Sequence, residues 1–275
     1  MKIALIQQRA SSNKEANIQK GIDAVRRAAT SGAKIISFAE LAFIPFFPQK
    51  PSEEKPLDIS ETIPGLTTEI FSGLAKELEI VIVLNLYERD GDNTYDASPV
   101  IDVDGKILGT TRMIHITDYA CFHEKDYYTP GNTGAPVYKT KYGRIGIAIC
   151  YDRHYPEYMR ALALNDAEIV FVPQAGAAGE WPEGLYEAEM RVAAFQNGYF
   201  TALCNRVGQE ECLTFAGESF VCNPDGEVIN RAGFGTDEIL LCDIDLNKCK
   251  SSHAKKLFMR DRRPELYPDW FRNDK

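Results

Sequence analysis

The sequence lacks the features that mark several common classes of protein. Its seven cysteines include no Cys-x-x-Cys pair, and its four histidines are not spaced as ligands of one metal ion, so we expect no zinc site. The net charge of −9 argues against general nucleic-acid binding, which requires a basic surface. No apolar run reaches membrane-spanning length. We therefore expect neither nucleic acid nor membrane among the partners of this protein.

The first residues and the cysteine content bear on location. Met1 to Ile6 is too short an apolar run for a signal peptide and leads directly into Gln7 and Gln8. An odd number of cysteines without a secretion signal favours reduced thiols. The pattern predicts a cytoplasmic protein with reduced cysteines.

What is present is a repeated order of apolar and amphipathic segments. The chain has 275 residues, of which 44% are hydrophobic, enough for one large domain or two small ones. The order strand, helix, strand, helix, strand, hairpin occurs before Lys139 and again after it. We expect strands over 2–8, 34–39, 80–87, 145–149, 167–174, 199–207 and 238–245, hairpins within 95–116 and 220–231, and helices over 13–31, 67–78, 157–164, 182–197 and 246–257.

This order predicts the fold class. A mixed sheet from each half, packed face to face with the helices outside, would bury both sheets. No low-complexity linker separates the halves. We therefore expect an α/β protein with two mixed β-sheets, a four-layer αββα sandwich that forms a single domain over 1–275.

Cys150 is the first candidate for chemistry. It ends the apolar run 145–149 and precedes a polar turn and the helix that Pro156 opens. Backbone N–H groups are free at such a strand-to-helix turn, where they can favour a thiolate and bind a developing oxyanion. The alternative is a small core residue, the commoner role of a lone cysteine. The polarity of Tyr151, Asp152, Arg153 and His154 favours the functional interpretation.

Glu40 is the second candidate, at the end of an equivalent strand in the first half. Taken alone, it could be a carboxylate at the rim that faces water. However, strand ends of this kind face a common crevice in α/β architecture. A carboxylate base beside a thiol makes an activated nucleophile.

These residues resemble the nitrilase superfamily of carbon–nitrogen hydrolases over nearly the whole chain, from Lys2 to about Tyr267. The resemblance rests on Glu40 and on three segments: Gly143-Arg-Ile-Gly with Cys150-Tyr-Asp and Pro156-Glu157, Glu124-Lys-x-Tyr-Tyr-x-Pro-Gly131, and Arg262-Arg-Pro-Glu-Leu-Tyr267. It implies an αββα sandwich and a Glu-Lys-Cys triad without cofactor or metal. By resemblance, Glu40 is the general base, Cys150 the nucleophile, Tyr151 the source of an oxyanion-hole N–H, and Glu124 a further carboxylate beside the triad.

The sequence departs from this family at the lysine. The family usually has Arg-Lys-x-His before the Glu124 loop, and counting back from His115 puts Met113 in the lysine position. A thioether offers neither a donor nor a charge. Arg112 could replace the lysine only if the strand carries a bulge, because a one-residue slip turns a side chain to the other face; otherwise Arg112 is a surface arginine. Lys125 is another available cation.

Arg153 bears on the substrate. The turn Cys-Tyr-Asp-Arg-His-Tyr-Pro resembles that of enzymes that hydrolyse N-carbamoyl amino acids, in which an arginine shortly after the cysteine grips the substrate carboxylate. A guanidinium suits bidentate carboxylate binding. The alternative is an ion pair of Arg153 with Asp152 or Glu157.

We therefore expect cysteine-dependent hydrolysis of an N-carbamoyl amino acid or a similar small linear amide through a covalent acyl-enzyme at Cys150. The rivals are an amidase for another small substrate, such as a carbamoylated amine or an ω-amide, and a ligand-binding homologue that lost turnover with the lysine. The resemblance also implies a homodimer or higher homo-oligomer, with the aromatic tail, residues 257–275, at the interface.

Overall fold

Two mixed β-sheets form the centre of the molecule, and the computed structural model describes residues 1–270. The first sheet has the order β15-β1-β2-β3-β5-β4, with β6 paired to β5. Its strands are β1 (Lys2–Gln7), β2 (Ala33–Phe38), β3 (Val81–Val83), β4 (Leu86–Asp90), β5 (Asn93–Ile101), β6 (Ile107–Arg112) and β15 (Glu238–Asp243).

The second sheet has the order β14-β13-β10-β9-β8-β7. Its strands are β7 (Val137–Thr140), β8 (Gly143–Ile147), β9 (Ile169–Gln174), β10 (Phe200–Asn205), β13 (Phe220–Cys222) and β14 (Val228–Arg231). A separate hairpin consists of β11 (Val207–Glu210) and β12 (Leu213–Ala216).

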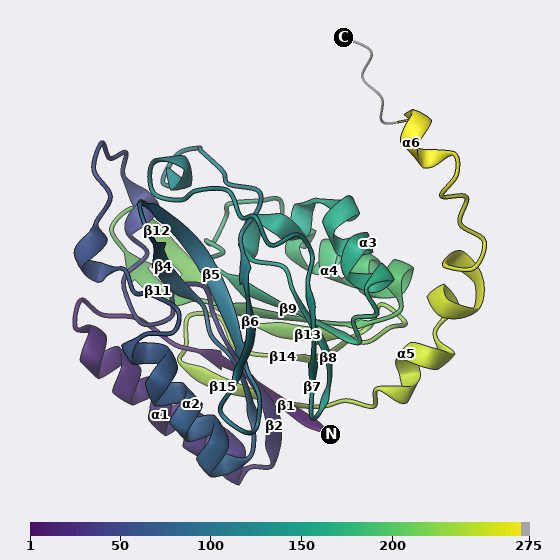
Figure 1. Ribbon diagram of the computed structural model, residues 1–275, viewed down its shortest axis with the longest axis horizontal. Coiled ribbons are helices and arrows are strands. Elements are labelled where there is room, and N and C mark those ends of the chain that lie inside the picture. Colours follow the sequence, from purple (N-terminus) through teal and green to yellow (C-terminus); the bar gives the residue numbers. More distant parts are fainter. Residues whose placement is uncertain (271–275) are drawn as a thin grey trace.

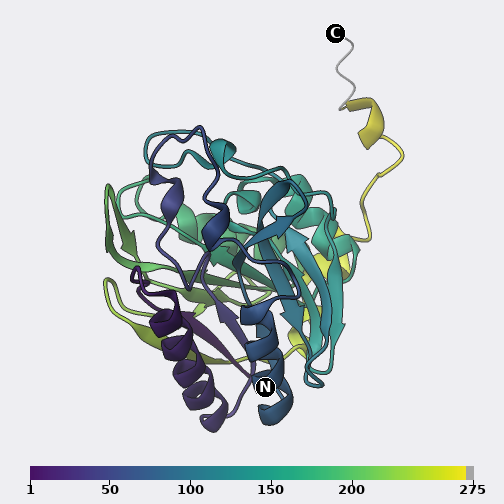
Figure 2. The ribbon, with the colours of Figure 1, turned by 60° about the vertical axis from the view of Figure 1, so that its left-hand side comes forward.

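Helices cover the outer face of each sheet, as Figures 1 and 2 show. On the first sheet, α1 (Lys14–Thr30) and α2 (Leu66–Leu78) bury an apolar cluster that includes Val25 and Phe71. On the second sheet, α3 (Pro156–Leu164) and α4 (Leu185–Asn197) bury one that includes Leu162 and Met190. Between the sheets lies the central core, to which Ile35 and Phe171 contribute. The expected αββα sandwich is confirmed.

The burial of the central strands explains their sequences. All six residues of β9 and all but the first of β1 are buried, because each strand has a sheet or a helix layer on both faces. Such strands have continuous apolar runs in place of an alternation with polar residues.

Several expected elements differ in the structure. The segment 80–87 is divided into β3 and β4, and the expected strand from Lys106 ends at Arg112 rather than Ile116. The expected helix over 246–257 is broken into α5 (Asn247–Ser251) and a short π-helix (Ala254–Phe258). The division into two halves was also wrong at one point, because β15 pairs with β1 in the first sheet.

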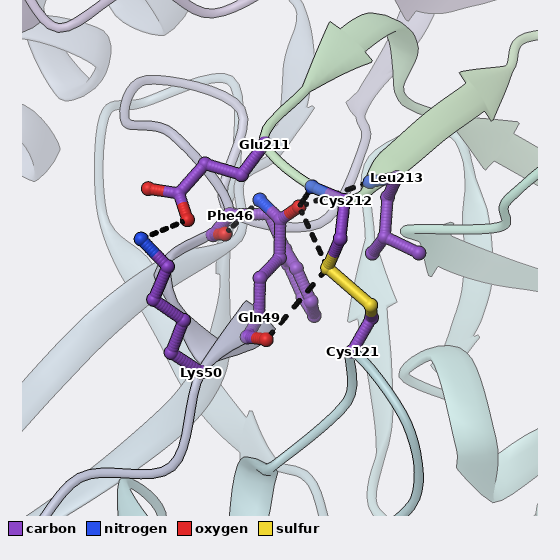
Figure 3. The surroundings of a disulfide bond; sticks show 7 residues. All are labelled: Phe46, Gln49, Lys50, Cys121, Glu211, Cys212 and Leu213. Atoms are coloured by element: carbon purple, nitrogen blue, oxygen red, sulfur yellow. Dashed lines mark hydrogen bonds and ion pairs between the residues drawn. A yellow bond between two sulfur atoms is a disulfide. The ribbon is translucent and has the colours of Figure 1, made fainter.

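The expectation of reduced cysteines was wrong for one pair. Cys121 and Cys212 form a disulfide (Figure 3), while the other five cysteines are free. Gln49 lies against this bond, where its side-chain oxygen accepts hydrogen bonds from the backbone N–H groups of Cys212 (3.1 Å) and Leu213 (3.2 Å). The disulfide ties the loop before Glu124 to the turn between β11 and β12.

The end of the chain extends away from the sheets. Figures 1 and 2 show α6 (Tyr267–Trp270) well separated from the two layers of helices. Among helices within residues 1–270, none combines the length and apolar character needed to cross a bilayer.

Candidate active site

Glu40, Glu124 and Cys150 meet at one end of the two sheets. A carboxylate oxygen from each glutamate and the sulfur of Cys150 all lie within 4.8 Å of one another. Glu40 follows β2, Cys150 opens a 3-10 turn after β8, and Glu124 opens a short 3-10 turn in the loop after β6. Both glutamates are 0% exposed and Cys150 is 6% exposed. The sandwich thus brings together two carboxyls and a thiol out of contact with bulk water.

The backbone at Cys150 presents its thiol on a sharp turn. Cys150 has φ of +41°, a left-handed conformation that costs a non-glycine residue about 1 kcal/mol or more. The first bond of the turn runs from the N–H of Asp152 to the carbonyl of Ile149 (2.9 Å). Tyr151 comes one residue before Asp152, so its N–H has no acceptor within the turn. A free N–H at this position suits the oxyanion-binding role expected for Tyr151.

Burial controls the ionisation of this thiol. The pKa of Cys150 is raised well above its usual value, first by burial and then by the charges of Glu40 and Glu124, while Arg153 acts in the opposite direction. The thiol is therefore neutral at pH 7 and must lose its proton as it attacks. A base is needed beside it.

Glu40 has the properties of that base. Burial and the nearby charge of Glu124 raise its pKa to about 8. Neither of its carboxylate oxygens has a conventional hydrogen-bond donor, and its neighbours are the carboxyl of Asp96 and the thiol of Cys150. A carboxylate with so little stabilisation is a stronger base than an exposed one, and the thiol is its available source of a proton.

Arg206 fixes the backbone around Glu40. Its Nη1 donates to the carbonyl of Glu40 (2.9 Å), and its Nη2 donates to the carbonyl of Ile44 (3.0 Å) and pairs with Glu210. The side chain is almost fully buried, and Arg206 directly follows β10 of the second sheet. The guanidinium therefore positions Glu40 through its main chain, not through its carboxylate.

Asp96 is a site residue that the sequence analysis missed. It lies on β5, is 1% exposed, and accepts a hydrogen bond from Asn85. Burial, followed by the adjacent carboxyl of Glu40, raises the pKa of Asp96 well above its usual value. A signal was present, because an aspartate inside an apolar strand is rarely buried without a functional or structural partner.

The two glutamates and the thiol also lie close enough together for their oxygen and sulfur atoms to bind one metal ion. Metal binding requires deprotonated ligands. Because burial raises the pKa of all three groups, this set of donors favours proton chemistry over metal binding.

The family profile described as carbon-nitrogen hydrolase matches residues 2–254 of this sequence. The chain belongs to this family, the nitrilase superfamily. It is 35% identical to an N-carbamoylputrescine amidase of Solanum lycopersicum over 96% of this chain and 93% of the relative, and 32% identical to a citrullinase of Francisella tularensis over 98% and 97%. The structure is similar to a carbon–nitrogen hydrolase from Helicobacter pylori G27, with a TM-score of 0.91 and 29% identity over 99% of each chain.

This carbon–nitrogen hydrolase has a methionine where the resemblance implies the catalytic lysine. Met113 is 0% exposed and packs in the same core cluster as Cys150 and Ala39. Its backbone N–H donates to the carbonyl of Asp96 (2.9 Å). The thioether therefore lies on the side of the sheet that faces Cys150.

Arg112 does not take the place of the lysine in this hydrolase. Its pairing with Ala97 and that of Thr111 with Ser98 are in continuous register, and the shift between β5 and β6 lies farther along, between Val100 and Ile101. Arg112 therefore points to the opposite face from Met113. There it binds Glu88 through two hydrogen bonds of 2.7 Å and pairs with Asp90 at 2.8 Å.

The alternative cation, Lys125, is exposed. Arg153 is buried, with a side chain that is 1% exposed, and it pairs with Glu189 (3.2 Å) rather than with Asp152 or Glu157. Its Nη1 donates to the carbonyl of Cys150 and to Gln174, both at 2.8 Å, while its Nη2 is buried without a partner. Arg153 thus adjoins the nucleophile and keeps one donor free.

Replacing Arg112 with methionine should lower stability without impairing catalysis. The change leaves the buried carboxylate of Glu88 without its main partner, so we expect the free energy of unfolding to fall by about 2 kcal/mol. The value of kcat/KM for folded enzyme should stay within about threefold of wild type. Urea denaturation and a hydrolysis assay on the same samples measure both quantities. A hundredfold loss of kcat/KM at unchanged stability would restore Arg112 as the replacement cation.

Proposed function

We propose that this chain hydrolyses the carbamoyl C–N bond of an N-carbamoyl amino acid. The reaction begins as Cys150 attacks the carbamoyl carbon while its proton passes to Glu40. The C–N bond then breaks, ammonia or an amine leaves with that proton, and water hydrolyses the acyl-enzyme. Hydrolysis of C–N bonds is the activity of the family; the carbamoyl amino acid is the proposed substrate.

The observation that carries this proposal is the unpartnered Nη2 of Arg153. A buried guanidinium N–H without an acceptor is costly, and this one belongs to a residue whose Nη1 contacts the carbonyl of Cys150. A substrate carboxylate would supply the missing acceptor with a charge-assisted hydrogen bond. The fit supports a substrate with an acidic group a short distance from its carbamoyl carbon.

A second candidate is a carbamoylated amine, and Glu180 favours it. The carboxylate of Glu180 accepts hydrogen bonds from the hydroxyls of Tyr119 and Tyr186 and from the N–H of Ala177 (3.0 Å). After burial, Glu180 is the largest cause of the raised pKa of both tyrosines, and Cys150 contributes as well. An anion at this place could hold an ammonium group. The relative from Solanum lycopersicum is named for such a substrate.

Ammonia release from four ureas separates the two candidates. N-carbamoyl-β-alanine carries a carboxylate, N-carbamoylputrescine an ammonium, citrulline both, and N-butylurea neither. We expect the carboxylate-bearing compounds to react best and Arg153→Ala to lower their kcat/KM about 30- to 100-fold, with little effect on N-butylurea. The control is Arg160→Ala, on α3 outside this site. A preference for carbamoylputrescine that Glu180→Gln removes would support the amine instead.

Association of this chain into a homodimer or higher homo-oligomer stays a prediction. In the described part of the tail, Leu257 is 44% exposed, Phe258 39% and Trp270 66%, a surface that a second copy could cover. Phe271, which we also expected at the interface, lies outside the described residues.

A further inference from the structure

The replacement of the family lysine by Met113 raises the question of what binds the oxyanion besides the N–H of Tyr151. Within residues 1–270, no cationic side chain donates to the carboxylate of Glu40 or to Oε1 of Glu124. Arg112 is bound to Glu88 and Asp90 on the other face of the sheet. Both Nη groups of Arg206 are bound to backbone carbonyls or to Glu210. Arg153 keeps its Nη2 free beside Cys150, and the proposed function assigns that donor to the substrate carboxylate. A donor of another kind is then needed for the oxyanion.

Three carboxyls form a cluster at this site: Glu40 and Glu124 lie beside the thiol, and Asp96 adjoins both of them. Glu40 and Glu124 are 0% exposed and Asp96 is 1% exposed. Three uncompensated negative charges so close together and out of water would be prohibitively unfavourable, so the cluster must hold protons. In support, the pKa of Glu124 is raised well above its usual value, first by burial and then by the charge of Asp96.

One oxygen of Glu124 is free to donate such a proton. Its Oε2 accepts the backbone N–H of Thr117 at 3.5 Å, whereas its Oε1 is buried without a partner. A carboxylate oxygen of Glu124 lies within 4.8 Å of the sulfur of Cys150. A carbon bonded to that sulfur therefore places its own oxygen within reach of this carboxyl.

We propose that Glu124, held as a neutral carboxylic acid, donates to the developing oxyanion the hydrogen bond that the absent lysine would otherwise supply. The S–C bond forms as the thiol proton moves to Glu40, and the electron pair of the C=O bond moves to oxygen, which the O–H of Glu124 and the N–H of Tyr151 bind. When the C=O bond re-forms, Glu124 keeps its proton and the leaving nitrogen takes the one on Glu40. This division of roles requires only the hydrolase chemistry, whichever substrate is used.

The groups that face Glu124 favour this state. They come from β5 and from loops and turns at the ends of the strands and are acidic or phenolic, with no basic group among the strongest influences on the pKa of Glu124. The ionisable groups that interact electrostatically with Glu124 are Glu40, Asp96, Tyr119, Tyr128, Cys150, Asp152 and Glu180. Because all of these are neutral or negative, they oppose loss of the proton at Glu124.

The test compares Glu124→Gln with Glu124→Met in the full-length enzyme. A glutamine can still donate a hydrogen bond, so its kcat/KM should remain within about tenfold of wild type, whereas methionine should lower it about 100- to 1,000-fold. Wild-type activity should also fall at alkaline pH as Glu124 loses its proton, and this alkaline limb should vanish in Glu124→Gln. The acidic limb, which Glu40 determines, should remain.

The readout should not depend on the natural substrate. Release of p-nitrophenolate from p-nitrophenyl acetate reports acylation of Cys150, so failure of every urea substrate would leave this test intact. Glu211→Gln, which removes an exposed carboxylate paired with Lys50 (Figure 3), is the control and should behave as wild type. Equal loss in the glutamine and methionine variants, or an alkaline limb that persists in Glu124→Gln, would overturn the proposal.

If the variants do not fold, infrared spectroscopy of the wild type at pH 7 still decides. The proposal requires a C=O band of a protonated, buried carboxyl that persists after the losses seen in the Asp96→Asn and Glu40→Gln variants are both subtracted, because Glu40, with a pKa of about 8, is also largely protonated at pH 7. A spectrum without such a band would mean that Glu124 is ionised, and the proposal would fail.

Discussion

Replacing Cys150 with alanine should abolish hydrolysis, with kcat/KM at least about 10⁴-fold below wild type. The sulfur is the nucleophile expected to form the acyl-enzyme, and the groups beside it are much weaker nucleophiles than a thiolate. Glu40 and Glu124 are buried carboxyls whose pKa values are raised, and Gln174, which donates to the sulfur at 3.3 Å, is an amide. Alanine keeps the Cβ atom and the positive φ at this position, so the turn should be preserved.

Ammonia release under saturating substrate measures this loss, with circular dichroism to verify folding. The matched control is Cys222→Ala, which removes another buried free thiol, on β13. That variant should lose stability but keep its turnover per folded molecule. Residual turnover of a few per cent in Cys150→Ala would mean that water is activated directly and that no covalent intermediate is required.

Replacing Glu40 with glutamine should have two large effects of opposite sign. Loss of the general base should lower kcat about 10²- to 10⁴-fold. Stability at pH 8, by contrast, should rise. The pKa of Glu40 is about 8 in the folded protein against 4.5 for an exposed glutamate. Between these values the unfolded chain gives up a proton that the folded protein keeps, so the carboxyl stabilises the fold fully below pH 4.5 and loses that contribution as the pH rises to 8.

The size of the effect follows from the shift. At about 1.4 kcal/mol per unit of pKa, ionisation of Glu40 costs the folded protein of the order of 3–5 kcal/mol by pH 8. Urea denaturation at pH 5, 6.5 and 8 should therefore give a smaller decline for Glu40→Gln than for wild type. Glu218→Gln, in the half-buried segment between β12 and β13, is the control. Identical pH dependence in wild type and Glu40→Gln would show that Glu40 titrates near its ordinary value.

Strand ends were the part of the site that the sequence could predict. Glu40 and Cys150 each terminate an apolar strand in equivalent places of the two halves. A carboxylate that can act as a base beside a thiol predicts an activated nucleophile. Glu124 was accessible only through the family resemblance, because its loop has no regular pattern. The positions of β2, α1 and β9 were also predictable, because each segment has either a clear hydrophobic period or a continuous apolar run.

The unpredicted features depend on contacts between distant segments. The disulfide joins Cys121 and Cys212, which are 91 residues apart, and local spacing carries no information about such a pair. The role of Arg112 depended on whether β6 has a bulge at that residue, which is a property of its pairing with β5. Asp96 was overlooked because its importance comes from Glu40, which reaches it from another strand.

The pairing of β15 with β1 has a consequence for how the protein is made. The backbone of Met1 bonds with Ile244, 243 residues away, and six residue pairs join β1 to β15, so β1 is paired on this side only by residues that are synthesised long after it. Until then β1 has an open edge, and the layer that carries Glu40 is unfinished. The nascent chain should therefore complete the layer that carries Glu40 only after the strands of the second sheet have been synthesised, so the two halves do not fold one after the other.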